Sequence, residues 1–545
     1  MNIKYIYQLL VIFYGFVLPI SSLGQNSFPA EKVSLMTDRE LYICGESISF
    51  SGMVSLNKEK NILSEAAYIE LISPSGQKIN QSKVKIINKT FNGQLIIPAD
   101  ALSGYYFIRA YTKWMRNGPV SDYSYVLLKL VNAYSQDLNE INDSLVEEGL
   151  FNTNKLELSQ DILLNKTHYQ ASEKVTIDFE KILNLPFTIA EISVFPLVAK
   201  TTYLQANNIK ASFYDSIYFY PETRGLTISG KVMDNEGLLP FHKVNLHLKD
   251  EKDFISVLSD SSGHFYIALP ERTGSNELFV IASTQGKEMI SVLIDQDFCT
   301  RPINLKVPPF SFADMDRDQL LIMAQTLQLN DLFYEKDTLL MEETLSNFPF
   351  YGKAYKSIVF DSYIELDSLS QYFTDLPSWV NVKKEKGKRK LFISGTEAEM
   401  GFIKPLVLID YVPIDDIESI LKIDPRRIES FDVIIKPYIH GGIIYGGIIA
   451  LFSRKSDFGG FTFPESAMYI NYNFYSPSKD LISHSNDSAI EFYNTSVWIP
   501  SISRETLHRD LDFYMPAIKG KYVFQFQYIN EFGEKKLSQN ILTID

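Results

Sequence analysis

PLVLIDYVPIDDIESILKIDPRRIESFDVI, residues 405–434, and HGGIIYGGIIALFSRK, residues 440–455, form the stretch that decides the fold of this chain of 545 residues. Apolar runs at 405–410, 428–435 and 448–453 predict three short strands. Residues 413–423 place apolar side chains at helical spacing with acids between them, which predicts a short helix. Asp424 precedes a proline and should end that helix, because this position disfavours helical backbone. Glycine pairs at 441–442 and 446–447 predict a turn before the third strand.

This order of strand, helix, strand, glycine turn and strand resembles the plug domain of TonB-dependent outer-membrane receptors, most closely the type found in Bacteroidota. The matching residues are Pro405, Leu406, Ile409, Asp410 and Pro413, then Ile420, Pro425, Ile428, Ser430, Val433 and Lys436, then Tyr445, Gly446, Gly447, Ile448 and Ile449. There are two departures, since Tyr411 stands where the family usually has glycine and the segment after Tyr445 is shortened. A receptor barrel needs about 22 strands of roughly 9–11 residues each, more than follow Lys455. The resemblance therefore implies a plug-like domain at 376–457 without its barrel.

The plug-like stretch also suggests where a partner binds. Residues 376–382 resemble the entry strand of such a plug, and residues 383–390 carry six basic residues and one acid around Gly387. This basic segment predicts a hairpin turn that is either simply solvated or in contact with anionic lipid headgroups or an acidic partner. We expect partner binding at this hairpin and at the exposed turn near residue 440. The predicted residues are Tyr438, His440, Ile443 and Tyr445, with Lys383, Lys384, Lys386, Lys388, Arg389 and Lys390.

Two regions precede the plug-like stretch. Residues 310–375 predict a partly helical connecting region, because apolar residues recur at helical spacing from Leu320 to Leu327. Residues 225–308 predict a small sandwich and resemble the carboxypeptidase regulatory-like domain, a transthyretin-like fold. The residues that carry this likeness are Gly230, Val232 and Asp234, then Pro240, Val244 and Leu246, then Asp260, Gly263 and Phe265. Gly263 should take a positive φ and Phe265 should enter the core. Asp260 is either a turn residue bonded to its own backbone or a calcium ligand.

The N-terminal part alternates apolar and polar residues between turn signals. Residues 28–132 therefore predict an immunoglobulin-like sandwich. They resemble the MG2-like macroglobulin domain of exported Bacteroidota proteins, through Thr37, Asp38, Tyr42, Gly45 and Glu46, 102–105 and 109–115. Trp114 is either a core residue or a ligand platform. After an acidic linker at 134–148, residues 150–222 predict a second macroglobulin-like sandwich, and residues 465–545 predict a C-terminal β-unit.

Composition narrows the class of protein. The net charge of −14 and the acidic pI exclude a broad basic face for nucleic acid. Residues 1–24 predict a signal peptide, with Lys4 before an apolar run and a small residue on either side of Leu23. The alternative is a membrane anchor, for which the apolar run is short. Cys44 and Cys299 are the two cysteines, and we expect them in separate domains without a disulfide.

No catalytic, cofactor or metal motif emerges. His242 and His247 lie five apart on a predicted strand and should face opposite ways. Asp415, Asp416 and Glu418 are either acids at a helix start or a carboxylate pair for catalysis. The thioester cysteine motif of protease-trapping macroglobulins is absent. Five triplets resemble the O-glycosylation sequon of Bacteroidota, starting at Asp143, Asp215, Asp337, Asp367 and Asp487.

The sequence thus predicts a mainly β chain of tandem β-sandwich domains, immunoglobulin/macroglobulin-like and transthyretin-like, with a small α/β plug-like domain. We expect an exported, non-enzymatic protein of the periplasm or cell surface, associated with the outer membrane. Its expected partner is an outer-membrane β-barrel protein or a transport or secretion complex. The alternative is a glycan- or peptide-binding module that acts in nutrient capture.

Overall fold

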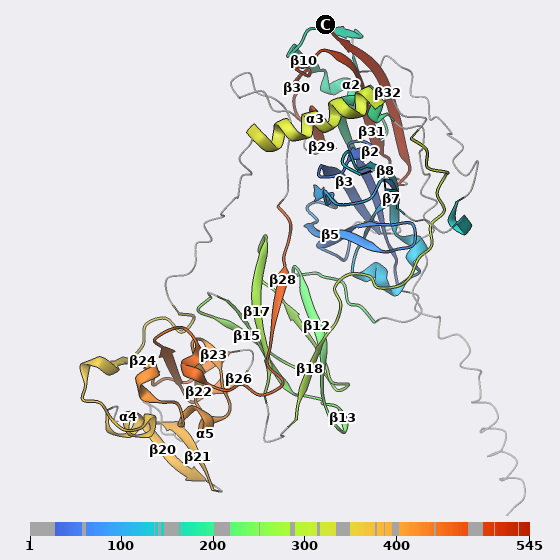
Figure 1. Ribbon diagram of the computed structural model, residues 1–545. Coiled ribbons are helices and arrows are strands. Elements are labelled where there is room, and N and C mark those ends of the chain that lie inside the picture. The colour runs from blue at the N-terminus through green and yellow to red at the C-terminus, as the bar shows by residue number, and fades with distance from the viewer. Residues whose placement is uncertain are drawn as a thin grey trace, which may run out of the picture. The chain divides into compact units, whose positions relative to one another are not determined.

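The protein divides into two compact units (Figure 1). The computed structural model describes residues 28–56, 61–135, 137–139, 143–146, 163–164, 166–200, 218–249, 251–283, 289–312, 317–333, 349–376, 379–385, 387–394, 403–440, 443–477, 494–505, 507–531 and 533–545. Unit 1 contains Met1–Arg224, Phe298–Lys336 and Ser476–Asp545, and unit 2 contains Gly225–Asp297 and Asp337–Tyr475. The predicted signal peptide and the triplets at Asp215, Asp337 and Asp487 lie outside the described residues. The chain is mainly β, with tandem sandwiches, which confirms the predicted fold class.

The first sandwich of unit 1 lies within the range predicted for it. One sheet has the order β1-β3-β6 and the other β2-β8-β7-β4-β5. The strands are β1 Glu31–Thr37, β2 Leu41–Ile43, β3 Ser47–Leu56, β4 Ala66–Ile72, β5 Lys78–Lys85, β6 Thr90–Ile96, β7 Gly104–Tyr111 and β8 Ser124–Val131. Two 3-10 turns, η1 Trp114–Asn117 and η2 Val120–Asp122, lie between β7 and β8. Trp114 is buried and its indole N–H donates to the Pro29 carbonyl at 2.8 Å, so it is a core residue.

Unit 1 also has a sheet outside the first sandwich, which we call the second sheet. It joins segments that are far apart in the sequence. Its order is β29-β11-β31-β32-β9, and β10 pairs separately with β30. The elements are β9 His168–Tyr169, β10 Lys174–Ile177, α2 Phe179–Leu183, β11 Ile189–Pro196, η4 Leu197–Ala199, β29 Val497–Ser503, β30 Leu511–Tyr514, β31 Gly520–Ile529 and β32 Lys535–Ile544. Residues 150–222 and the end of the chain thus share one sheet, whereas we expected a separate sandwich and a separate C-terminal unit. The physical reason is that β11 is buried along nearly its whole length and needs a strand on each side.

Buried charged side chains connect the second sheet to the first sandwich. The Arg39 guanidinium lies 3.0 Å from Glu46 and 3.4 Å from Asp38, and it donates to the Thr495 hydroxyl at 2.8 Å. Thr495 also donates to Asp38, and the Asn494 amide donates to Glu46 at 2.5 Å. Both acids belong to the motif that resembles MG2-like domains. These motif residues therefore connect parts of unit 1 rather than bind a ligand.

Glu191 on β11 completes this buried network. Its carboxylate accepts hydrogen bonds from the Ser51 hydroxyl of β3, at 2.5 Å, and from the Gln527 amide of β31. Because burial disfavours the charged form, the pKa of Glu191 is raised to about 7. The network therefore holds one carboxyl group whose charge changes near neutral pH.

The segment after Phe298 returns to unit 1. The Cys299 N–H donates to the Tyr111 hydroxyl at 2.7 Å, and the Cys299 carbonyl accepts from Arg109 at 3.2 Å. Cys299 thus lies against the first sandwich, in the same unit as Cys44, so the expected placement in separate domains was wrong. Both cysteines are buried and free. Helix α3, Arg317–Phe333, follows, and Met323 packs against apolar residues of β2.

Unit 2 begins with a β-sandwich over the range where we expected a transthyretin-like one, and β28, from outside that range, joins it. One sheet has the order β13-β12-β16, with β18 also paired to β12, and the other has the order β15-β14-β17-β28. The strands are β12 Thr227–Asp234, β13 Gly237–Leu238, β14 Lys243–Leu248, β15 Phe254–Leu258, β16 His264–Ala268, β17 Ser275–Ala282, β18 Ser291–Ile294 and β28 Met468–Asn473. Gly263 has a φ of 78° and Phe265 is buried, as predicted. Asp260 accepts from the N–H groups of Ser262 and His264, which supports its role in the turn.

The plug-like stretch forms a small mixed sheet in unit 2. Its order is β19-β24-β27-β22-β23, with β22 and β27 parallel and the other pairs antiparallel. The elements are β19 Lys356–Val359, η5 Phe360–Ser362, α4 Leu369–Asp375, β20 Val380–Glu385, β21 Lys388–Ile393, β22 Leu406–Ile409, β23 Val412–Pro413, α5 Ile417–Ile420, η7 Pro425–Arg427, β24 Ile428–Ile434, β25 Tyr438–His440, β26 Ile443–Tyr445, β27 Ile448–Ser453 and η8 Phe458–Gly460. The expected connecting region at 310–375 is divided, since α3 belongs to unit 1 and β19 to this sheet. The predicted helix at 413–423 is shorter than expected and is followed by the 3-10 turn η7.

The turn between β22 and β23 contains Tyr411, where the sequence departs from the plug pattern. Asp410 and Tyr411 form a two-residue turn with φ values of 44° and 65°, where glycine is usually preferred. The Tyr411 ring lies 5.3 Å from that of Phe452. The Asp410 carboxylate accepts from the N–H and hydroxyl of Ser453, at 2.8 and 2.6 Å, and from the Phe458 N–H at 2.9 Å. Asp410 therefore fixes this corner of the sheet.

Candidate functional site

The hairpin of β25 and β26 carries four of the predicted partner-binding residues. Directly opposed residues of an antiparallel pair share a face, and the pairs are Tyr438 with Tyr445, Ile439 with Ile444 and His440 with Ile443. All four predicted residues therefore lie on one face. That face packs inward, because Tyr445 is buried and the His440 ring stacks on Phe254 at 4.2 Å.

The opposite face of the hairpin is open to solvent. Ile439 is 68% exposed and Ile444 is 57% exposed. The four predicted residues, Tyr438, His440, Ile443 and Tyr445, thus lie on the packed face, and Ile439 and Ile444 lie on the exposed one. The two-residue period of a strand would have separated these faces in the sequence, given one buried residue as a reference.

The basic hairpin of β20 and β21 is partly used within unit 2. Val380 and Leu391 are buried in the core of the mixed sheet. The Arg389 guanidinium donates to Glu418 at 3.1 and 2.9 Å, and this hydrogen bonding lowers the pKa of Glu418 to about 2. Lys390 pairs with Glu385 at 2.5 Å. Arg389 and Lys390 thus act within the unit.

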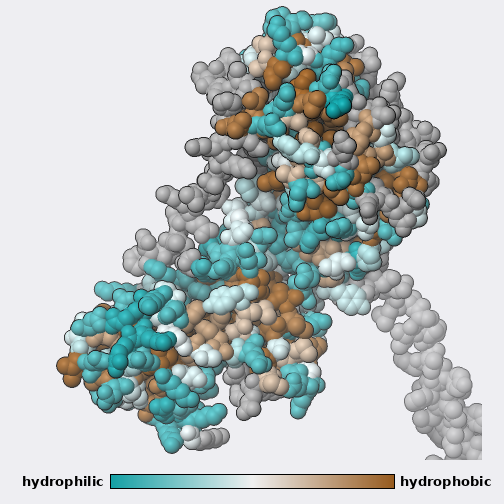
Figure 2. Space-filling model, in the orientation of Figure 1, coloured by the Kyte–Doolittle hydropathy of each residue, from teal (hydrophilic) through white to brown (hydrophobic). Residues whose placement is uncertain are grey.

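Three predicted lysines remain at the surface of this hairpin. Lys383, Lys384 and Lys388 are exposed, and Figure 2 shows hydrophilic residues over this part of the molecule. Lys386 lies outside the described residues. The hairpin therefore offers positive charge to solvent, which fits both the solvated and the anion-binding interpretations.

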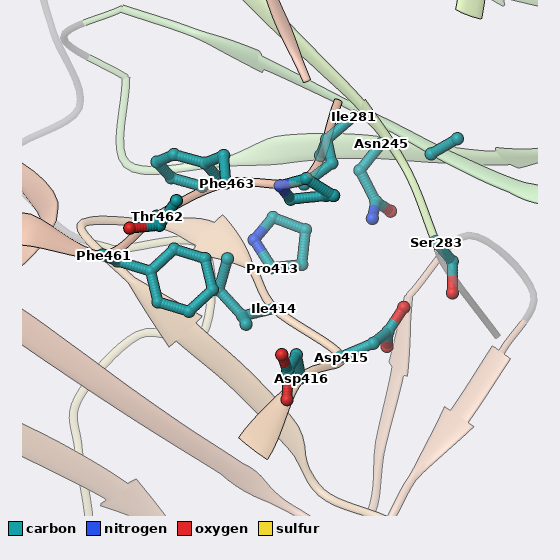
Figure 3. Close-up of a pocket in the computed structure, with 12 residues that line it drawn as sticks. Asn245, Ile281, Ser283, Pro413, Ile414, Asp415, Asp416, Phe461, Thr462 and Phe463 are labelled. Carbon is teal, nitrogen blue, oxygen red and sulfur yellow. The ribbon is translucent and has the colours of Figure 1, made fainter. Parts of the chain in front are cut away.

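A small pocket lies between the sandwich of unit 2 and the mixed sheet. Its volume is about 140 Å³, well below the roughly 300–1,000 Å³ of a usual ligand pocket. Figure 3 shows Phe461 and Phe463 on one side and Ser283 and Asp415 on the other. This size suits a few water molecules or one small group.

The acids beside this pocket have structural partners. Asp415 pairs with Lys243 at 3.1 Å, and the Asp416 carboxylate caps α5 by accepting from the Ser419 N–H. Glu418, with its lowered pKa, stays ionised at neutral pH and cannot act as a general acid there. The helix-start interpretation is therefore supported over a catalytic carboxylate pair. Among the residues that the structure describes, no group of three or more His, Cys, Asp or Glu side chains is placed to hold a metal ion.

A wider hollow lies in unit 1. Its volume is about 1280 Å³, and its lining includes Glu65, Lys89, Thr188 and Glu531. The aromatic residue in the lining, Phe187, has its ring 5.3 Å below the Arg504 guanidinium. The alternative of glycan or peptide binding stays a prediction.

Within the described ranges, no helix is both long and apolar enough to span a membrane.

Comparison with known proteins gives distant structural neighbours. No family model and no curated protein match the chain. Alpha-2-macroglobulin from Salmonella, reacted with methylamine, is 10% identical, with a TM-score of 0.16. The alignment covers 97% of this chain and 24% of the Salmonella chain. Trypsin-activated alpha-2-macroglobulin from Escherichia coli is 9% identical, with a TM-score of 0.23. The alignment covers 94% of this chain and 41% of the Escherichia coli chain. This chain thus spans less than half the length of these neighbours, and scores this low assign no family.

Proposed function

We propose that this chain is a non-enzymatic binding protein of the Gram-negative cell envelope. Its macroglobulin-like and carboxypeptidase regulatory-like sandwiches would serve as spacers. The plug-like mixed sheet would dock to an outer-membrane β-barrel protein or to a transport or secretion complex. The observation that carries this proposal is the β25–β26 hairpin, which has one packed face and one exposed apolar face.

The packed face makes the exposed face a defined surface. The Tyr438 hydroxyl donates to the Phe350 carbonyl at 3.3 Å, and Phe350 also packs edge-on against His440. A short hairpin held in this way keeps Ile439 and Ile444 in fixed positions. Burial of two such side chains against a partner favours binding by about 1.5–3 kcal/mol each. The lysines of the β20–β21 hairpin would add salt-dependent attraction to an acidic partner.

Capture from detergent-solubilised outer membranes tests the proposal. The full chain should retain barrel proteins, identified by mass spectrometry. The double variant Ile439→Asn, Ile444→Asn should retain at least about tenfold less, which corresponds to about 1.4 kcal/mol. Ile364→Asn is the matched control, because Ile364 is 81% exposed elsewhere in unit 2.

Equal recovery by the wild type and the double variant would contradict docking through this hairpin. A variant with Lys384→Glu and Lys388→Glu tests the basic β20–β21 hairpin separately from the isoleucines. Its recovery should fall at low salt and approach that of the wild type at high salt, since salt screens exposed charges.

A further inference from the structure

The small pocket of unit 2 contains a buried amide that faces into it. Asn245 on β14 lines the pocket, is only 2% exposed, and accepts at Oδ1 from the Ser256 hydroxyl of β15. Among the residues that the structure describes, no protein group accepts a hydrogen bond from the Asn245 amide N–H groups. Buried polar groups are nearly always paired, so the partner of this amide should lie in the pocket.

An acceptor lies across the pocket from this amide. Figure 3 shows the Asn245 amide and the Asp415 carboxylate on facing sides of the pocket, with Ser283 beside them. Asp415 Oδ1 pairs with Lys243 at 3.1 Å, and its Oδ2 can still accept a hydrogen bond. The pocket thus offers a donor, an acceptor and a hydroxyl to one small group.

The opposite wall of the pocket is apolar and firmly held. Phe461 and Phe463 line it, and their ring centroids lie 5.0 Å apart. Phe463 also contacts Phe279 of β17, with 4.7 Å between ring centroids. Apolar and aromatic walls with a few placed polar groups are typical of sites for small molecules.

The polar groups select among classes of ligand. An ammonium or guanidinium group could bind Asp415, but it only donates and would leave the Asn245 N–H groups without an acceptor. A carboxylate or phosphate only accepts, and it would lie against the negative charges of Asp415 and Asp416. A hydroxyl group both donates and accepts, so two neighbouring hydroxyls can pair with both walls.

We propose that this pocket binds one ring of a neutral sugar through two neighbouring hydroxyl groups. One hydroxyl accepts from the Asn245 amide, the other donates to Asp415, and the C–H face of the ring packs against Phe461 and Phe463. The rest of a longer glycan would extend past Asp415 and Asp416, which are both exposed. This site uses no residue of the β25–β26 hairpin.

Saturation-transfer difference NMR on the full chain tests this inference, with the methyl glycosides of glucose, galactose, mannose and N-acetylglucosamine as probes. At least one should bind with a Kd of about 1 mM, the weak affinity expected of so small a ligand. Asn245→Leu should weaken that binding at least about tenfold, because it removes the amide and keeps a similar volume.

Two further variants keep the test decisive. Ser283→Ala is a milder change at the pocket, for use if Asn245→Leu does not fold, and it should also weaken binding. Ser362→Ala lies at an exposed position outside the pocket and should bind like the wild type.

The same measurement with butylammonium tests the cationic class. The proposal is overturned if butylammonium binds more tightly than every glycoside, or if folded Asn245→Leu and Ser283→Ala variants bind sugar like the wild type. It is also overturned if none of the glycosides binds at about 20 mM, well above the Kd expected of ligands of this size. The double variant Ile439→Asn, Ile444→Asn should bind sugar normally, so this proposal and barrel docking can fail independently.

Discussion

The two units join their parts by different chemistry. In unit 1 the first sandwich meets the second sheet through buried ionic and hydrogen-bonded groups centred on Arg39. In unit 2 the sandwich meets the mixed sheet through aromatic rings, with Phe279 4.7 Å from Phe463 and 5.9 Å from Phe458. The first junction contains buried charges that need exact donor and acceptor positions, beside a small apolar cluster of Met36, Met53, Ile189 and Ile529, and the second depends mainly on apolar area.

This difference predicts how each junction responds to change. A buried ion network stabilises one arrangement of its groups, and it becomes strongly unfavourable when one partner is removed. An aromatic junction tolerates exchange between apolar side chains of similar volume. Unit 1 should therefore be sensitive to single polar changes and to pH, and unit 2 to loss of volume.

The largest expected effect is in unit 1. Arg39→Met leaves Asp38 and Glu46 buried without their cation, and it should cost about 3–5 kcal/mol of unfolding free energy. Urea unfolding followed by tyrosine and tryptophan fluorescence measures it. Arg426→Met is the control, because Arg426 pairs with Glu365 at the exposed surface, where solvent screens the pair, and its loss should change the unfolding free energy far less. Equal losses in the two variants would show that the buried Arg39 network stabilises unit 1 no more than an exposed ion pair does.

Volume loss in unit 2 should come next. Phe279→Ala removes the ring that contacts Phe458 and Phe463, and it should cost about 3–4 kcal/mol of unfolding free energy. Phe279→Leu should cost less than about 1.5 kcal/mol, because it keeps most of the apolar volume. A leucine variant as unstable as the alanine variant would mean that ring geometry, rather than area, holds this junction.

The pH response of unit 1 sharpens the comparison further. Because the pKa of Glu191 is raised in the folded state, folding takes up a proton between about pH 4.5 and pH 7. The stability of the wild type should therefore fall as pH rises through this window and level off above it. Glu191→Gln should show a smaller fall, because burial also raises the pKa of Asp38 and this acts in the same direction. The variant should gain about 1–3 kcal/mol over the wild type at pH 8 relative to pH 5.

Thermal unfolding at pH 5, 6, 7 and 8 measures this response. Glu505→Gln changes an exposed carboxyl of the same unit and should keep the wild-type pH profile. A Glu191→Gln variant that follows the wild type at every pH would refute the role of this carboxyl group.

The smallest effect concerns the turn at Tyr411. Tyr411→Gly should raise the unfolding free energy of unit 2 by about 0.5–1 kcal/mol, because glycine adopts positive φ without strain. Gly387→Ala is the opposite test at a positive φ of 84° with open space around it, and it should lower stability by about 1 kcal/mol. A loss of stability in Tyr411→Gly would show that the contact with Phe452 outweighs the strain. Chemical denaturation compares the two variants.

Much of the local structure could be predicted from the sequence. The strand at 448–453 matches β27, the one at 405–410 is one residue longer than β22 at each end, and the one at 428–435 is one residue longer than β24 at its C-terminal end. Such runs are short, apolar and bounded by turn residues, so their own residues determine them. Gly263 and Asp260 were predicted for the same reason, since a tight turn is specified within four or five residues.

Long-range pairing could not be predicted in this way. Nothing in the residues of β11 indicates that β31 will lie beside it, because the alternation of a strand describes its faces and not its neighbours. The inward packing of the β25–β26 residues that we expected to bind a partner could not be predicted for a related reason. The sequence shows alternation there, but only packing shows that Tyr445 is the buried reference.

The pairing of β11 with the end of the chain has a consequence for biosynthesis. Gln527 and Glu191 are separated by 336 positions, so β11 leaves the ribosome or a translocon long before β31 exists. The second sheet of unit 1 is then the last part to close, and the buried strand β11 lacks the strands on both its sides until synthesis is nearly complete. A product cut short before residue 520 would lack this closure and should be degraded, even though the first sandwich and all of unit 2 had been made.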